Sequence, residues 1–436
     1  MKKVNHSYTA EIFDTSQYTK QIKKENLPTN ITTSQHPFHR WFNFIAGFSP
    51  EFVHACCAEI DGEVDAILLD PFAGCATAPL VASQRGLRAI GFDAHPVFAR
   101  IGRAKLASHL FLQELDWIEK AIKEGLENPK PLSLLASAPL IFLSKLLPED
   151  SLKMLIGARE SLKKNNLFES DLAFLVLSKI VELCSHSQTD GIYKAPTSRK
   201  KALSPFEACN KVTEMIRTDL NSHSVFNYHQ QASIIFNSSE AMSEVEDESI
   251  SIVVTSPPYL NNFDYAEMTR MLLYFWEIAT SWADITDKVR SKLIVNTTTA
   301  LRGHKAKQDM YRSNIPNQIH THLDVIVEQL REQRKIKTGK KEYDFLIYPY
   351  FSQMTRVLGE CYRSMKQNAP IHIMIADSAL YGVHISTPQI LEKILDSLSF
   401  RNIKCSLVRQ RGHRWILAKR DGSETGLGEY HITAMK

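Results

Sequence analysis

The chain has 436 residues, of which 44% are hydrophobic and 23% charged, which is the composition of a globular protein. Its length exceeds that of one compact domain and suits a catalytic core with insertions. The 52 Lys and Arg residues nearly balance the 48 Asp and Glu residues, leaving a net charge of +4. This balance neither requires nor excludes nucleic acid as a partner, because local patches matter more than the sum.

The sequence disfavours a membrane protein and a secreted one. No apolar run approaches the roughly 18–20 residues of a membrane helix, and the N-terminus lacks the apolar segment of a signal peptide. The seven cysteines form no CxxC pair, which favours reduced thiols over disulfides or a zinc site. His36 and His39 have no third ligand nearby, so we expect no bound metal. The reduced thiols and the missing signal peptide predict a cytoplasmic location.

The first predicted unit follows a polar arm, residues 1–35. Residues 66–69 are a short apolar run that predicts a buried strand, and a Gly-containing turn leads into a helix over 76–84. A second strand over 88–92 ends at Asp93. This order and spacing predict a parallel βαβ unit with a right-handed crossover.

Two further units follow after a gap. Strands over 232–236 and 249–254 and a helix over 265–279 make the second. The third comprises a helix over 349–365, a strand over 371–376, a helix over 388–398 and two strands around Gly412, over 403–410 and 414–419. Parallel units that end in an antiparallel hairpin predict an α/β fold with a mostly parallel sheet.

Two stretches lie outside these units and are interpreted as inserts. Residues 111–230 have helical periodicity up to about residue 185 and then a turn-rich tail, whereas 280–345 are polar and basic. Loops this long are rare in a compact domain unless they are functional or form lobes. The predicted core is therefore interrupted and consists of 36–110, 231–279 and 346–436.

A small-residue turn, Asp70-Pro71-Phe72-Ala73-Gly74-Cys75-Ala76-Thr77, joins the first strand to its helix. Parallel sheets bind ligands outside the carboxyl ends of their strands, where such a turn lets a cofactor approach the backbone. Asp93, at the end of the next strand, can accept hydrogen bonds from ribose hydroxyls. Because GxGxxG is absent, the pattern favours a nucleoside cofactor without a diphosphate. The alternative is a structural turn followed by an exposed aspartate.

A second motif, Thr255-Ser256-Pro257-Pro258-Tyr259, follows a predicted buried strand. Its prolines stop the strand and leave carbonyls without local partners. A serine hydroxyl and a proline carbonyl held side by side can accept both protons of an amino group, and the tyrosine ring can stack on a planar base. The structural alternative is a rigid proline turn capped by serine.

Together the two motifs resemble those of the S-adenosylmethionine-dependent DNA amino-methyltransferases, particularly the TSPPY type associated with cytosine N4. The similarity covers about 36–100 and 232–420 apart from the inserts. Further similar segments are His36-Pro37-Phe38, Phe48 to Val53, Gly91 to Pro96, Asp377 to Ile385 and Arg409 to Gly412. The resemblance implies a Rossmann-like methyltransferase sheet and S-adenosylmethionine as the cofactor.

The resemblance also implies roles for single residues. Phe72 and Gly74 would shape the methionine pocket and Asp93 would hold the ribose. The other expected cofactor-binding residues are Asp70, Thr255, Ser238, His36 and Pro50. Catalysis would fall to Ser256, Pro257, Pro258 and Tyr259: the Ser256 hydroxyl and the Pro257 carbonyl accept the two N–H bonds of the exocyclic amine, and Tyr259 stacks on the flipped base.

The chain departs from the family pattern at three places, the first being the 178-residue separation of the two motifs, within which we expect the insert over 111–230 to recognise the target. Ala76 stands where the family usually has a second glycine, and we expect only modest narrowing there because alanine is tolerated at a helix start. The acidic residue expected after the third strand is absent; Ser238 falls closest to its position, and Glu240 is the alternative. No cysteine lies in a Pro-Cys context, which disfavours methylation at cytosine C5.

Basic clusters in or near the inserts favour contact with DNA phosphates. The candidate nucleic-acid-binding residues are Arg199, Lys200, Lys201, Arg302, Lys305, Arg334, Lys335, Arg409 and Arg411. Any single run of this kind is usually a solvated surface, and it is their joint location that favours DNA.

The sequence therefore predicts a prokaryotic DNA methyltransferase acting on a flipped base of duplex DNA, most simply at cytosine N4. We expect it to be cytoplasmic, associated with the nucleoid when bound to DNA, and paired with a cognate restriction endonuclease in restriction-modification or defence. The alternatives are an adenine-N6 DNA methyltransferase, an RNA amino-methyltransferase and a degenerate subunit that binds cofactor without catalysis.

Overall fold

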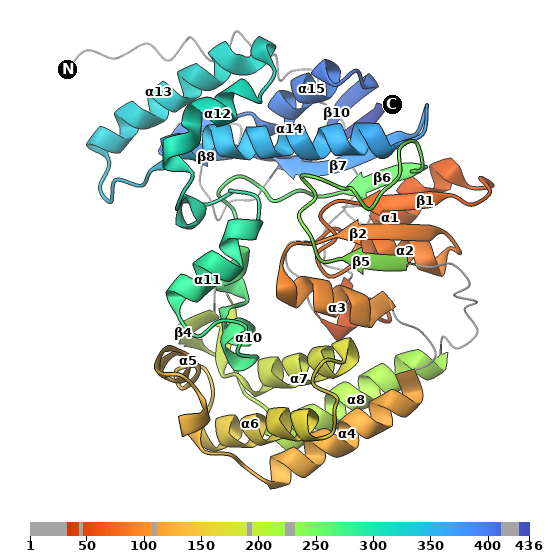
Figure 1. The fold of residues 1–436 in the computed structure, drawn as a ribbon, viewed down its shortest axis with the longest axis vertical. Coiled ribbons are helices and arrows are strands. Elements are labelled where there is room, and N and C mark those ends of the chain that lie inside the picture. The colour runs from red at the N-terminus through yellow and green to blue at the C-terminus, as the bar shows by residue number, and fades with distance from the viewer. Residues whose placement is uncertain (1–32, 43–46, 107–110, 190–193, 223–231, 411–426) are drawn as a thin grey trace.

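The computed structural model describes residues 33–42, 47–106, 111–189, 194–222, 232–410 and 427–436. Its central element is a seven-stranded sheet in the order β10-β11-β7-β6-β1-β2-β5 (Figure 1). The strands are β1 Ile67–Asp70, β2 Arg88–Phe92, β5 Ala232–Ile235, β6 Ile252–Thr255, β7 Pro370–Ala376, β10 Arg401–Gln410 and β11 Gly428–Met435.

All pairings from β5 to β7 are parallel, and β11 lies antiparallel between β7 and β10. The chain starts at β1, winds out through β2 to β5 and then returns to β6 on the other side of β1. The strand order therefore reverses between β1 and β6, and a crevice at such a reversal is the usual ligand site of an open α/β sheet. The predicted fold class is confirmed.

Helices cover both faces of the sheet, which explains why β1 and β6 are continuous apolar runs. Side chains alternate between the faces. Leu68 and Val254 pack toward α1 (Pro50–Cys57) and α2 (Thr77–Gln84). Leu69, Val253 and Ile373 pack toward α14 (Ile347–Ser364) and α15 (Thr387–Ser397), in a cluster that also includes α13 (His320–Ile336).

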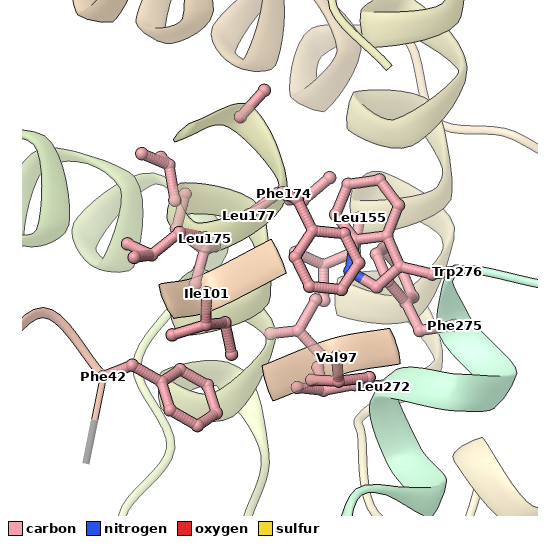
Figure 2. Packing of buried hydrophobic residues seen from close by; sticks show 14 of the residues in the cluster. Phe42, Val97, Ile101, Leu155, Phe174, Leu175, Leu177, Leu272, Phe275 and Trp276 are labelled. Carbon is pink, nitrogen blue, oxygen red and sulfur yellow. The ribbon is translucent and has the colours of Figure 1, made fainter. Parts of the chain in front are cut away.

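The first insert is a helical layer below the sheet in Figure 1, made of α4 Phe111–Glu127, α5 Ser137–Leu143, α6 Glu149–Lys164, α7 Asp171–Cys184, α8 Pro205–Ser222 and a short hairpin, β3 Ser187–Thr189 with β4 Lys194–Arg199. It shares one hydrophobic core with α3 (Pro96–Leu106) and α10 (Arg270–Phe275). Figure 2 shows Phe174 and Leu155 of the insert packed with Val97, Ile101 and Trp276. The insert is thus built onto the catalytic core.

The second insert contributes α11 Trp282–Lys288, α12 Gln308–Ser313 and α13. It follows two short helices, α9 Tyr265–Met268 and α10, and precedes a small hairpin, β8 Ser378–Leu380 with β9 Val383–Ile385, that comes directly after β7. None of the helices in the described segments is long and apolar enough to span a bilayer.

Some predicted elements need correction. The partner of β10 is β11, and residues 414–419, which were predicted to pair with it, lie outside the described residues. The predicted helix over 265–279 is interrupted at Thr269, which divides α9 from α10. The turn-rich tail of the first insert contains a hairpin and leads into α8, and α1 was not predicted.

Candidate active site

A cavity of about 810 Å³ lies at the carboxyl ends of β1, β2, β5 and β6, where the strand order reverses. The lining includes residues of both motifs: Asp70, Phe72, Gly74 and Asp93 on one side, and Ser256 and Pro258 on the other. The fold therefore brings together two motifs that are far apart in sequence.

Asp70 joins the two motifs at the bottom of the cavity. Its Oδ1 accepts hydrogen bonds from the Thr255 hydroxyl at 2.7 Å and from the backbone N–H of Phe72 at 3.0 Å. Burial raises the pKa of Asp70 to about 7. Thr255 is itself buried and does not line the cavity, so its role here is to hold Asp70.

The turn after β1 is tied to the end of β2. The N–H of Gly74, which has a φ of 53°, donates to Asp93 Oδ2 at 2.9 Å, and the N–H of Ala73 donates to the carbonyl of Phe92. Ala76 has a φ of 66°, a left-handed conformation that costs about 1 kcal/mol for a residue with a Cβ. Its buried methyl packs with Ala99 and contributes about 0.8 kcal/mol, which offsets part of that cost.

Asp93 is the second carboxyl group that lines the cavity, beside Asp70. Its second oxygen accepts the N–H of His95 at 2.7 Å, and both oxygens keep further lone pairs for a ligand hydroxyl. Burial raises its pKa to about 7. Burial also lowers the pKa of His95 to about 3, and this neutral ring bonds through Nε2 to the Thr269 hydroxyl at 2.9 Å. The end of β2 is thereby fixed to the break between α9 and α10.

The Ser256–Tyr259 turn is held by groups from α14 and β11. The Tyr350 hydroxyl donates to the Pro258 carbonyl at 2.8 Å, and the Tyr259 hydroxyl donates to Glu429 at 2.7 Å. Within the described chain no hydrogen bond is donated to the Pro257 carbonyl, although Pro257 is buried. Ser256 lines the cavity beside Pro258, whereas Pro257 and Tyr259 are not part of its lining.

The segment after β5 contains Ser238 and Glu240, the two candidates for the position of the missing acidic residue. Ser238 lines the cavity, together with Asn237 and Ser239. Glu240 lies outside the lining, because its carboxylate accepts from the Gln353 amide at 2.9 Å and pairs with Arg356 at 3.2 Å. Of the two candidates, only Ser238 is placed to meet a ligand.

His36 and Pro50 do not line the cavity, so the geometry does not support direct cofactor contact for either. The His36 ring bonds to Glu51 at 2.7 Å, and Pro50 is the buried first residue of α1. Gly47 and Phe48, just before α1, line the cavity instead. The cavity thus reaches this segment through Gly47 and Phe48, and cofactor contact by His36 and Pro50 stays a prediction without support from the lining.

Several lining residues were not predicted, and they include His95, Phe98, Tyr265 and the run Lys292–Ile294. Tyr265 and Phe98 could have been found because they lie six residues after Tyr259 and five residues after Asp93. Lys292–Ile294 carry no sequence signal, because the second insert reaches the cavity only through the tertiary fold.

The basic residues chosen as DNA contacts are mostly paired with carboxylates. The pairs are Arg302 with Asp287 at 3.0 Å, Lys305 with Glu342 at 2.5 Å, Arg334 with Asp344 at 3.1 Å, Lys335 with Glu332 at 2.6 Å and Arg409 with Glu429 at 2.6 Å. Lys200 donates to the Glu182 carbonyl, the Arg199 side chain is not among those described, and Arg411 lies outside the described residues. The clusters are less basic locally than their sequence suggests.

One group of described side chains has the composition of a metal site, namely Cys56, His372 and His431. The two imidazoles share a hydrogen bond of 3.1 Å, and their ring centroids are 5.3 Å apart, so the rings meet edge to edge along one line. A metal ion would instead need both lone pairs to converge on a third point. Burial also raises the pKa of Cys56, which disfavours the thiolate. We interpret the group as a hydrogen-bonded pair beside a packing thiol.

Comparison with known proteins adds to this geometry. No family model matches the chain. The chain is 25% identical over 422 residues to Type II methyltransferase M.AvaI from Nostoc sp., covering 89% of this chain and 85% of that protein; M.AvaI from Anabaena variabilis gives the same values. It is 22% identical over 484 residues to Type II methyltransferase M.BsoBI from Geobacillus stearothermophilus, covering 100% of this chain and 90% of that protein. The alignments thus cover most of this chain, and the relatives support a methyltransferase family for it.

Proposed function

We propose that this protein is a site-specific DNA methyltransferase of a restriction-modification system, transferring a methyl group from S-adenosylmethionine to an exocyclic amino group, cytosine N4 above all. The observation that carries the proposal is that one cavity is lined both by the Asp70–Gly74 turn with Asp93 and by Ser256 and Pro258. A nucleoside-binding half and an amine-accepting half therefore adjoin. The relatives named Type II methyltransferases support the same conclusion.

The residues present fit S-adenosylmethionine. Asp93 has acceptor capacity for ribose hydroxyls, the small side chains of Ala73 and Gly74 leave room for the methionine part, and Ser238 lies beyond β5, where the base of the nucleoside is expected. The cofactor supplies an activated methyl group on a sulfonium. The protein supplies binding and orientation, which is the main requirement of a direct transfer between two bound groups.

The amine half works by accepting hydrogen bonds. An exocyclic amine is a weak nucleophile because its lone pair is delocalised into the ring. The Ser256 hydroxyl and the Pro257 carbonyl would accept its two N–H bonds and favour a pyramidal nitrogen. The Tyr350 hydroxyl uses one lone pair of the Pro258 carbonyl, whereas no group of the described chain donates to the Pro257 carbonyl, which keeps both lone pairs for substrate. No covalent intermediate is required.

Stacking of the flipped base depends on Tyr259. Its hydroxyl is held by Glu429, whose other oxygen accepts Arg409 Nε at 2.6 Å, so the ring is anchored from β11. A flipped base would stack on this ring and recover part of the few kcal/mol that unstacking costs. Arg409 thus acts on the base indirectly in this proposal, through Glu429 and Tyr259.

Cytosine N4 is favoured over adenine N6 because serine, not Asp or Asn, precedes Pro-Pro-Tyr. DNA phosphates would be met by exposed basic residues of the inserts. Arg302, for example, keeps 68% of its side chain exposed although it pairs with Asp287. Exposed ion pairs of this kind contribute about 0–1 kcal/mol, so such a guanidinium can exchange its carboxylate for a phosphate at little cost.

The test is transfer of labelled methyl groups from S-adenosylmethionine to plasmid DNA, to RNA and to no nucleic acid, followed by identification of the modified nucleoside. N4-methylcytosine in DNA is the expected product. N6-methyladenine would overturn the choice of base, and labelled RNA would overturn the choice of polymer. Cofactor binding without any transfer would indicate the degenerate subunit and refute the proposed activity.

A further inference from the structure

A segment of the second insert, residues 290–299, contacts both the cofactor cavity and the loop that follows the Ser256–Tyr259 turn. We call it the bridging segment. Lys292, Leu293 and Ile294 line the cavity. At its two ends, Arg290 Nε pairs with Asp264 at 3.0 Å and the Thr299 hydroxyl donates to the same carboxylate at 2.7 Å. Asp264 is the N-cap of α9, so both ends of the segment meet where the loop after Tyr259 enters that helix.

Asn296 is the central contact of the bridging segment. Its side-chain N–H₂ donates to the backbone carbonyls of Tyr259 at 3.3 Å and Phe263 at 2.9 Å. The backbone carbonyl of Asn296 accepts the N–H of Asn261 at 2.6 Å. Asn296 is 5% exposed, so these bonds are formed away from water. The two prolines leave the carbonyls that follow them without a regular ladder, and a primary amide supplies two donors on one atom.

The cavity side of the bridging segment has a different anchor. The N–H of Val295 donates to the buried Gln353 side chain at 2.8 Å, and the Gln353 amide in turn donates to Glu240 at 2.9 Å. Adjacent residues of one segment are therefore held by separate groups. Asn296 fixes the catalytic loop, and Gln353 fixes the wall formed by Lys292–Ile294.

We propose that Asn296 is a positioning residue for methyl transfer. It holds the backbone after Tyr259 in the conformation that presents the Pro257 carbonyl and the Tyr259 ring to a substrate base. The inference rests on the proposed function. It assigns to the second insert a part in assembling the site, in addition to any contact with DNA.

The discriminating variant is Asn296→Asp, which keeps the shape and replaces the two donors by an acceptor facing two carbonyls. We expect kcat to fall roughly 10- to 100-fold, because small displacements of reacting groups carry losses of this size. The Kd for S-adenosylmethionine should stay within about twofold, because that wall has its own anchor. Part of kcat should return as the pH falls, since a protonated Asp can donate to one of the two carbonyls. Asn317→Asp adds the same charge at an exposed position of the same insert and should match the wild type.

A reciprocal variant, Gln353→Leu, should give the opposite result: a Kd for S-adenosylmethionine raised roughly 10-fold, as for the loss of one buried hydrogen bond, with kcat at saturation less affected. Hydrogen exchange in peptides covering 256–264 should rise in Asn296→Asp and not in Asn317→Asp. If the wild type is active and Asn296→Asp keeps more than half of kcat, or loses kcat and cofactor affinity in proportion, the positioning role is wrong. If the wild type itself transfers no methyl group, the proposed function fails, and the role of Asn296 in that reaction fails with it.

Discussion

The role of the Tyr259 ring can be separated from that of its hydroxyl. Tyr259→Ala removes the stacking face, and alanine substitution at such a face costs about 1–3 kcal/mol per base. This loss corresponds to a decrease of roughly 5- to 150-fold in kcat/KM. Tyr259→Phe keeps the ring and loses only the 2.7 Å bond to Glu429. Because Glu429 remains paired with Arg409, we expect the Phe variant to stay within about tenfold of the wild type.

The assay is single-turnover methylation of a duplex that carries the target base either paired or opposite a mismatch, once the recognition sequence has been read from methylated DNA. An unpaired base costs less to extrude. The defect of Tyr259→Ala should therefore shrink on the mismatched duplex, whereas Tyr259→Phe should show little difference between the two. Full activity of Tyr259→Ala on paired DNA, or an equal defect on both substrates, would refute the stacking argument.

Three other outcomes are expected. First, ionised Asp93 accepts ribose hydroxyls better than the neutral acid, so the Kd for S-adenosylmethionine should rise by up to tenfold per pH unit below about 7. This pH dependence should be absent in Asp93→Asn. A calorimetric Kd for the wild type that does not change from pH 8 to 5.5 would contradict this. Second, the buried carboxylate of Asp219 accepts hydrogen bonds from the backbone N–H of Phe38, from Arg40 and from the Trp41 indole. Asp219→Ala should therefore lower the free energy of unfolding by roughly 3–5 kcal/mol in denaturant titrations. A loss below about 1 kcal/mol would contradict this role of Asp219. Third, a Cβ at Gly91 would lie 2.7 Å from the Ala73 Cβ, so Gly91→Ala should lower the free energy of unfolding by about 1–3 kcal/mol. The substitution should also displace the turn after β1 and weaken cofactor binding. An unchanged Kd for S-adenosylmethionine would contradict this displacement.

The pKa of Asp93 also sets a stability window. Because burial raises it from its ordinary value to about 7, the folded state binds this proton more tightly than the unfolded chain does. Its contribution to the free energy of unfolding should therefore increase as the pH falls from about 7 toward 4, and stay constant at its lowest value above about 7. Stability and cofactor affinity thus respond to pH in opposite directions at this residue.

The two motif regions could be predicted from sequence because their signals are local. The strand over 66–69, the small-residue turn and the strand ending at Asp93 are adjacent in the chain, and Ser256 follows a buried apolar run. The reversal of strand order that unites the motifs follows from the topology of parallel sheets, so one shared cavity was a fair expectation. Ser238 was found by its place after the third strand.

What could not be predicted depends on tertiary contacts. Lys292–Ile294 reach the cavity from an insert, and no local pattern marks Asn296 as the partner of two distant carbonyls. The local charge of the basic clusters could not be predicted either, because their carboxylate partners lie farther along the chain. Arg334 pairs with Asp344, 10 residues away, and Arg302 pairs with Asp287, 15 residues away. Strand β11, the true partner of β10, was missed because Gly412 supplied a turn signal closer to β10.

The central claim is that Ser256 and its neighbours direct a methyl group onto an amino group of DNA. The most direct measurement is mass spectrometry of nucleosides from DNA of cells that express the wild-type chain or Ser256→Ala. We predict N4-methylcytosine with the wild type and its loss, beyond about tenfold, with the variant, because one of the two acceptors of the amine is removed. The absence of any methylated amino group in the wild-type sample, or equal methylation in both samples, would contradict the account.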